Sequence, residues 1–274
     1  MKKINKILLM VLLIGCLTFS GCGEKANNIS QGKSQASAVG SETKAAEDSK
    51  KQSDANSVKA EQVEKDDTTS EKGNTIRGKW IEIPEDIKQT MDGVSLPKDA
   101  KVKFADLAYL IIPHYNFEGG IENGFMVVNK KVADEVLDIF AELYSIKYPI
   151  EYMEIVDYFN ASDFESIEAN NTSAFNYRES TTGSGNLSMH AYGLAIDINP
   201  KINPYVDSSG KGSHKNAEEY WNRDISKWTS SIAKQAYIGR ETKIYDIFVN
   251  KHGWTWGGDW ASYHDYQHFE KKIN

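Results

Sequence analysis

Two histidines and one aspartate in the second half of the chain have the residue types and spacing of a metal site. His190 and Asp197 lie within the segment Ser188–Asp197, and His268 follows close to the C-terminus. Two imidazoles and one carboxylate fill three corners of a zinc tetrahedron and leave the fourth for water, which is the arrangement of catalytic zinc sites. These residues therefore favour a zinc hydrolase.

The spacing of these residues resembles that of a known protein family. Residues 188–197 read S-x-H-x-x-G-x-A-x-D, and residues 265–269 read D-x-x-H-F. Both patterns resemble those of the M15 zinc peptidases of the D-alanyl-D-alanine carboxypeptidase and L-alanyl-D-glutamate endopeptidase type, which act on bacterial cell-wall peptides. The resemblance covers roughly residues 120–274 and includes three further segments: residues 170–178, 197–200 and 254–260.

The resemblance implies an α+β fold, in which a small antiparallel sheet is flanked by helices as in Hedgehog and DD-peptidase zinc domains. It implies Zn²⁺ as the cofactor, with His190, Asp197 and His268 as its ligands, and peptidoglycan stem peptides as the substrate. A D-alanyl-D-alanine carboxypeptidase is the expected activity. An L-alanyl-D-glutamate endopeptidase is one alternative, and a non-catalytic zinc module that binds wall peptides is another, because a shared fold does not fix function.

Two further residues match positions that take part in catalysis in this family. Asp265 lies where the family has its acidic general base, which takes a proton from a water whose pKa the zinc lowers to roughly 7. Arg178 matches the arginine that stabilises the developing oxyanion. As structural alternatives, Asp265 would cap a turn and Arg178 would form a surface ion pair.

Three more residues are expected to bind substrate or to support the site. Ser188, two positions before the first ligand, is expected to form a hydrogen bond there, and no base is placed to give it a covalent role. Tyr177 and Trp256 are expected either in the substrate groove or in the core. The same alternatives stay open for Trp260.

The segment His264–His268 also offers a rival ligand scheme. It reads H-D-x-x-H, close to the helical H-E-x-x-H zinc motif. That motif needs a helix to bring both histidines onto one face, whereas the aromatic neighbours here favour a strand. His264 is therefore expected either at the surface or beside the metal ligands, without binding the metal itself. The remaining histidines match no ligand spacing and are expected to be structural or exposed: His114, His214 and His252.

Hydrophobic periodicity predicts the elements in the first part of the folded region. Residues 106–128 predict two strands around a turn at residues 118–120, with residues 125–128 in the return strand. Asn129 then caps a helix that Pro149 ends.

The ligand-bearing segments are expected mostly on strands. Residues 173–178 and 194–199 each predict a strand, and the second has Asp197 on its polar face. Residues 241–251 predict a helix that stops at Gly253. A last strand carries His268, and its pairing with residues 194–199 would place His268 beside Asp197.

The N-terminus predicts export and lipidation. Basic residues precede an apolar run from Ile7 to Phe19, which is short for a membrane-spanning helix of about 20 residues. Residues 19–22 resemble a lipobox, so residues 1–22 are expected to be a lipoprotein signal peptide with Cys22 as the lipidated residue. Cys16 is the alternative lipidation site, and a plain cleaved signal peptide is the alternative to lipidation.

The expected domain order follows from composition. Residues 23–75 are predicted to be a disordered tether because residues 24–75 contain no aromatic residue. Residues 76–119 are an N-terminal extension, and residues 120–274 are the zinc peptidase domain. The formal net charge of −7 argues against nucleic acid as a partner. We expect a monomer, held by its lipid anchor on the outer face of the cell membrane.

Overall fold

The computed structural model describes residues 76–180 and 185–273. The chain divides into two units, Met1–Lys65 and Asp66–Asn274, and every described residue belongs to the second. The expected signal peptide, its Cys22 and the segment 23–75 lie outside the described residues. Within residues 76–180 and 185–273, the structure has no helix with the length and apolar character needed to cross a membrane.

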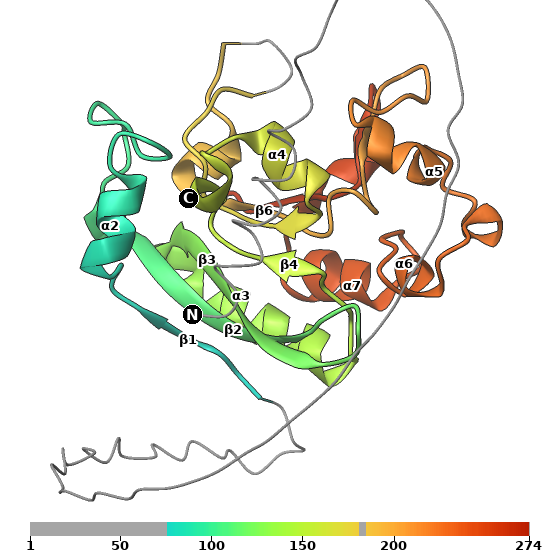
Figure 1. Cartoon of the computed structure of the whole chain (residues 1–274), viewed down its shortest axis with the longest axis horizontal. Helices are drawn as coiled ribbons and strands as arrows, with labels where there is room; N and C mark the ends of the chain where they lie inside the picture. Colours follow the sequence, from blue (N-terminus) through green and yellow to red (C-terminus); the bar gives the residue numbers. More distant parts are fainter. Residues whose placement is uncertain (1–75, 181–184, 274) are drawn as a thin grey trace, which may run out of the picture. The chain divides into compact units, whose positions relative to one another are not determined.

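The described chain contains both helices and strands (Figure 1), and the longest of them are the strands β2 and β3 and the helix α3. The strands are β1 (Lys79–Ile81), β2 (Leu107–Tyr115), β3 (Ile121–Asn129), β4 (Tyr152–Met153), β5 (Asn171–Thr172), β6 (Ala195–Asp197), β7 (Tyr205–Val206), β8 (Thr255–Trp256), β9 (His264–Asp265) and β10 (His268–Glu270). The α-helices are α2 (Glu85–Met91), α3 (Lys130–Ser145), α4 (Asp163–Glu168), α5 (Glu218–Trp221), α6 (Ser231–Gln235) and α7 (Lys243–Tyr245), which continues as a π-helix over Asp246–Lys251. The predicted α+β class is therefore correct.

The first sheet is antiparallel, in the order β1-β2-β3, and both of its faces are buried. Alternate side chains of a strand point to opposite faces. Leu110 and Met126 therefore join the main core under α3, whereas Tyr109 and Val127 face a second cluster that contains Ile87 of α2. Figure 1 shows α3 running along β2 and β3.

The second sheet, in the order β6-β10-β8, carries two of the expected ligands. Its strands are antiparallel, and β10 lies in the middle. Phe269 of β10 is fully buried and stacks on Phe248, with 4.1 Å between the ring centroids. Burying such an aromatic side chain stabilises the fold by roughly 1.5–3 kcal/mol, so the core anchors β10 at the residue next to His268.

The two predicted strands around residues 118–120 are present as β2 and β3, and the predicted helix is present as α3. The Asn129 side chain accepts a hydrogen bond from the backbone N–H of Lys131, as expected for a cap. The helix ends at Ser145, before Pro149, because Lys147 adopts a left-handed conformation with φ of 56°. The prediction that Pro149 ends this helix was therefore wrong.

Other strand predictions were too long. Of residues 173–178, Ser173 forms an isolated bridge with Asp197, and the rest form no strand. The strand predicted at residues 194–199 is confined to β6. Instead of one small antiparallel sheet, the described chain has two three-stranded antiparallel sheets, the antiparallel pair β7-β9 and the parallel pair β4-β5.

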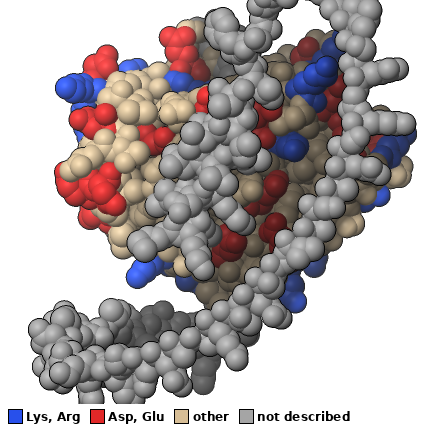
Figure 2. Space-filling model, viewed as in Figure 1, with Lys and Arg blue, Asp and Glu red and all other residues tan. Residues whose placement is uncertain are grey.

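Charged side chains of both signs are interspersed on the face shown in Figure 2. Acidic side chains gather at its left edge, where α2 lies in Figure 1. The first turn of α2 holds Glu85 and Asp86, which favour the positive end of the helix dipole. This acidic edge accords with the negative net charge of the chain.

Candidate metal centre

His190, Asp197 and His268 meet in the interior, and each side chain offers a ligand atom within 4.8 Å of the other two. His190 Nε2 lies 3.2 Å from Asp197 Oδ2, and His268 Nδ1 lies 3.1 Å from Asp197 Oδ1. The two imidazole nitrogens, His190 Nε2 and His268 Nδ1, are 3.1 Å apart. All three residues are buried, at 3–5% exposed.

The outer nitrogen of each imidazole is held by a hydrogen bond. His190 Nδ1 donates to the backbone carbonyl of Ala174 at 2.5 Å, and His268 Nε2 donates to Glu270 Oε2 at 3.3 Å. A proton fixed on the outer nitrogen leaves the lone pair of the inner nitrogen for the centre. Once the inner nitrogens are deprotonated, two imidazole lone pairs and a carboxylate face one another, and this donor set fits Zn²⁺.

The turn before β6 sets the position of His190. Ser188 caps the 3₁₀ helix Met189–Tyr192 by accepting a hydrogen bond from the His190 backbone N–H at 3.3 Å. Gly193 ends this helix with φ of 66°, and its carbonyl accepts from Asn129 N at 2.9 Å. A Cβ at Gly193 would lie 2.6 Å from Asn129 N. Glycine is therefore required here both by the positive φ and by the lack of space for a side chain.

The charges of the side chains at this centre favour binding of a cation. Burial would raise the pKa of the Asp197 carboxyl, but the imidazoles of His190 and His268 outweigh burial and lower that pKa below its usual range. Burial would lower the pKa of His268, but its hydrogen bonds to Asp197 and Glu270 raise it to about 10. A proton or a metal cation is therefore favoured between these side chains.

Asp265 borders a cavity of about 170 Å³ together with two of the ligands, His190 and His268. Its Oδ1 is buried and has no hydrogen-bond partner among residues 76–180 and 185–273. Burial, followed by the nearby charge of Asp197, raises the pKa of Asp265 to about 7. A carboxyl group with a pKa close to neutral is suited to take up and return a proton.

Arg178 lines the same cavity and is held by the carboxylate of Asp163. Its Nη2 lies 3.0 Å from Asp163 Oδ1, and its Nη1 donates to the Glu179 carbonyl at 3.3 Å. Arg178 Nε is buried without a partner among the described residues. The guanidinium is thus fixed at the edge of the cavity, within electrostatic range of Asp265.

The three expected supporting residues lie in different places. Ser188 lines the cavity and holds the His190 backbone. Tyr177 lies outside the set of residues that line this cavity, and its hydroxyl accepts from Lys101 N at 3.2 Å. Trp256 is 3% exposed and belongs to the hydrophobic core, where its Nε1 donates to the Tyr266 carbonyl. Trp260 does line the cavity.

The other histidines lie apart from the metal ligands. His264 Nδ1 is 3.0 Å from the Gly258 carbonyl, and its ring lines a different cavity. His214 pairs with Glu168 and is buried, and His252 pairs with Glu142. His114 is also buried. The strand expected for residues 264–268 is present in part, as β9 and the first residue of β10.

Two carboxylates at this centre were missed in the sequence. Glu270 lies on the same face of the last strand as His268, and this spacing was the available signal for its role beside the ligand. Asp163 lies on α4, and nothing in the sequence indicated that α4 would pack beside Arg178.

One comparison with known proteins found a match, to a family model. The family model described as D-alanyl-D-alanine carboxypeptidase matches residues 182–271, the segment that carries His190, Asp197, Asp265 and His268. No curated protein and no solved structure matches the chain. The match supports the resemblance to the M15 peptidases, and with it a peptidase that acts on peptidoglycan peptides.

Proposed function

We propose that this protein is a zinc-dependent D-alanyl-D-alanine carboxypeptidase that trims peptidoglycan stem peptides during cell-wall remodelling. The observation that carries the proposal is the buried group of His190, Asp197 and His268 beside the carboxylate of Asp265. Two imidazoles and one carboxylate leave one zinc position open, as catalytic zinc requires. The family match to residues 182–271 supports the same class of enzyme.

Each residue around the cavity would have its own role in amide hydrolysis. Zn²⁺ held by His190, Asp197 and His268 would supply Lewis acidity at the open position. Asp265 would accept the proton of the attacking water and return it to the leaving amine. Arg178 would donate to the oxygen of the scissile carbonyl as negative charge develops on it. His190 and His268 are the buried residues of this lining, and burial strengthens electrostatic interactions with them.

Two other functions fit parts of the same site. An L-alanyl-D-glutamate endopeptidase would use the same centre on an internal amide bond. A binding module would keep the zinc for structure and recognise wall peptides without cleaving them. Asp265 Oδ1 has no hydrogen-bond partner in the part of the chain that the structure describes, and this favours catalysis over binding, because a purely structural zinc does not need such a carboxylate oxygen beside it.

The N-terminal sequence supports a proposal about location. Residues 1–22 would be a lipoprotein signal peptide, and lipidated Cys22 would anchor a monomer to the outer face of the cell membrane. A tether over residues 23–75 would let the domain reach roughly 40 Å from the anchor. Metabolic labelling with a fatty-acid analogue tests this: Cys22→Ala should lose the label, whereas Cys16→Ala should keep it.

Mass spectrometry of muropeptides tests the activity directly. Detergent-solubilised full-length protein would be incubated with purified muropeptides, with and without a chelator. Metal-dependent loss of one D-alanine is the expected result. Cleavage between L-alanine and D-glutamate would establish the endopeptidase instead. No metal-dependent product from any stem peptide would overturn the enzymatic proposal and favour the binding module.

A further inference from the structure

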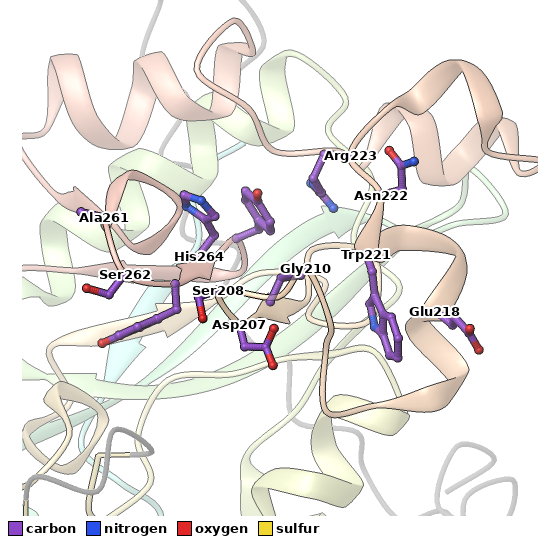
Figure 3. A pocket seen from close by; sticks show the side chains of 13 residues that line it. Asp207, Ser208, Gly210, Glu218, Trp221, Asn222, Arg223, Ala261, Ser262 and His264 are labelled. Atoms are coloured by element: carbon purple, nitrogen blue, oxygen red, sulfur yellow. The ribbon is translucent and has the colours of Figure 1, made fainter.

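A second cavity of about 790 Å³ lies next to the candidate metal centre and has no role in the chemistry described above (Figure 3). Its wall comes from the segments around β7, α5 and β9. Tyr263 lines both this cavity and the smaller one at the metal centre. We call this larger space the side cavity. Its size falls in the range of cavities that hold small organic ligands, about 300–1,000 Å³.

Strand β9 separates the side cavity from the metal centre. Neighbouring residues on a strand point to opposite faces. His264 accordingly lines the side cavity, whereas Asp265 lines the metal cavity. β9 is held in place by antiparallel pairing with β7, in which Val206 lies opposite His264. A ligand in the side cavity would therefore lie one strand away from the proposed general base.

A series of ring contacts links the two cavities. Tyr205 and Tyr263 have ring centroids 5.4 Å apart, and Tyr263 and Trp260 have centroids 5.3 Å apart. Trp260 in turn lies 5.3 Å from the ring of the ligand His268. Tyr205, Tyr263 and Trp260 are only partly buried, so they offer an aromatic surface from the edge of the side cavity to the metal centre.

The polar groups of the side cavity are held in fixed positions. Asp207 Oδ1 accepts hydrogen bonds from Ser209 N, Ser209 Oγ and Lys211 N at 2.7–3.0 Å. Arg223 donates to the Ile202 carbonyl at 2.7 Å, and its guanidinium stacks on Tyr266, a ring of the cavity wall. Such preorganised groups lower the cost of binding a ligand.

The chemistry of the side cavity fits a sugar. Figure 3 shows the Asp207 carboxylate and the Trp221 ring on facing sides, with Ser262 and His264 on another part of the wall. The lining includes acceptors, donors and groups that do both, as ligands rich in hydroxyl groups require. Aromatic rings pack against the apolar faces of a sugar ring while polar groups bind its edges. The lining carries two carboxylates, Asp207 and Glu218, and one cation, Arg223, and the resulting net negative charge disfavours an anionic stretch of peptide here.

We propose that the side cavity binds an uncharged N-acetylated sugar of the glycan strand that carries the stem peptide. This proposal rests on the proposed function, because it extends the peptidoglycan substrate from the peptide to its glycan. The sugar lies in the side cavity and the peptide crosses the aromatic surface at Tyr263 to reach the metal centre. The enzyme therefore prefers stem peptides that are still attached to sugar.

Two measurements on full-length protein test the proposal. The first compares KM for the free pentapeptide with KM for the same peptide attached to its N-acetylglucosaminyl-N-acetylmuramoyl disaccharide. We expect KM for the disaccharide-peptide to be about tenfold lower. Ser262→Trp fills the cavity from an exposed position and should bring the two KM values together. Gln89→Trp, exposed on α2, is the matched control and should retain the difference.

The second measurement follows binding of the free reduced disaccharide by NMR, without any hydrolysis. Binding to wild-type protein and to the Gln89→Trp control, but not to Ser262→Trp, would support the side cavity as a sugar site. Equal KM values for the two peptides, with no disaccharide binding, would overturn it while leaving the peptidase proposal intact. Binding of the disaccharide without hydrolysis of either peptide would overturn the peptidase proposal and retain the sugar site.

Discussion

His268 and Asp197 lie directly opposite each other in the antiparallel pairing of β10 with β6. This register brings His268 Nδ1 to 3.1 Å from Asp197 Oδ1. Phe269, the next residue of β10, lies opposite Ile196, and both side chains are fully buried. Since a slip of one residue would turn His268 away from Asp197 and expose Phe269, the hydrophobic core also fixes the geometry of the candidate metal centre.

Replacing His268 by Ala should abolish zinc retention and hydrolysis, because it removes one of three buried ligands. His264→Ala is a matched control, since His264 precedes it in the H-D-x-x-H segment but contacts the Gly258 carbonyl. Zinc content per protein by elemental analysis and the rate of D-alanine release are the measurements. A His268→Ala protein that keeps zinc and activity, or a His264→Ala protein that loses zinc, would contradict the ligand assignment.

Glu270→Gln should weaken zinc binding by about 10- to 100-fold while leaving the fold intact. The charged carboxylate of Glu270 accepts a hydrogen bond from His268 Nε2, and this bond directs the Nδ1 lone pair toward the centre. A neutral amide holds the ring less firmly. Competition with a fluorescent chelator measures the affinity. Glu241→Gln, at an exposed position, is the control and should keep the wild-type affinity for zinc. An unchanged zinc affinity in Glu270→Gln would show that Glu270 does not position His268.

Zinc affinity should fall as the pH is lowered. The pKa of His268 is raised to about 10 by Asp197 and Glu270, against the effect of burial. Below that pH the imidazole holds a proton that zinc must displace, so each unit of decrease in pH should weaken binding up to about tenfold. Calorimetry in buffers of different ionisation enthalpy should detect close to one proton released per zinc at pH 7. An affinity that is constant between pH 6 and pH 8 would argue against this linkage.

Asn199→Ala should destabilise the protein by about 3 kcal/mol. Asn199 is fully buried, and it bonds Thr172 Oγ1 through its backbone N–H, and Glu151 N and the Pro149 carbonyl through its side chain. It also adopts φ of 44°, which asparagine tolerates better than alanine. Urea unfolding would measure the loss. Asn250→Ala, which removes one exposed hydrogen bond to Asp246, is the control and should cost less than about 1 kcal/mol.

Part of the ligand geometry could be predicted because strand periodicity is a local property, whereas the choice of His190, Asp197 and His268 as ligands rested on their residue types and on the resemblance to the M15 peptidases. Alternating apolar residues placed Asp197 and His268 on specific faces of two strands, and the predicted pairing of those strands matches the structure. The helix capped by Asn129 was predictable for the same reason, since its apolar positions repeat at helical spacing.

The interactions that could not be predicted join segments far apart in the chain. Arg178 and Asp163 meet only because α4 packs beside the cavity, and no local pattern encodes that contact. Trp256 was ambiguous because a tryptophan near a site suits a groove wall and a core equally well. Its burial was decided by neighbours from other segments, such as Tyr245, whose ring centroid lies 5.5 Å away.

Asp163→Asn should lower kcat by about tenfold, and Arg178→Ala should lower it by about 10²–10³-fold, as for loss of an oxyanion donor. Asp163 holds Arg178 Nη2 at 3.0 Å, so its charge positions the guanidinium without acting on the substrate. Zinc content should stay at the wild-type level in both variants, because neither residue is a ligand.

The combined variant Asp163→Asn/Arg178→Ala separates positioning from a purely structural effect. If Asp163 acts only through Arg178, the double variant should have the kcat of Arg178→Ala alone, because residues that act as a unit are not additive. A kcat lowered by the product of the two single effects would show that Asp163 acts independently of Arg178. Glu165→Gln, on the same helix α4, is the matched control and should leave kcat unchanged, since its carboxylate pairs with the Asn160 side chain away from Arg178.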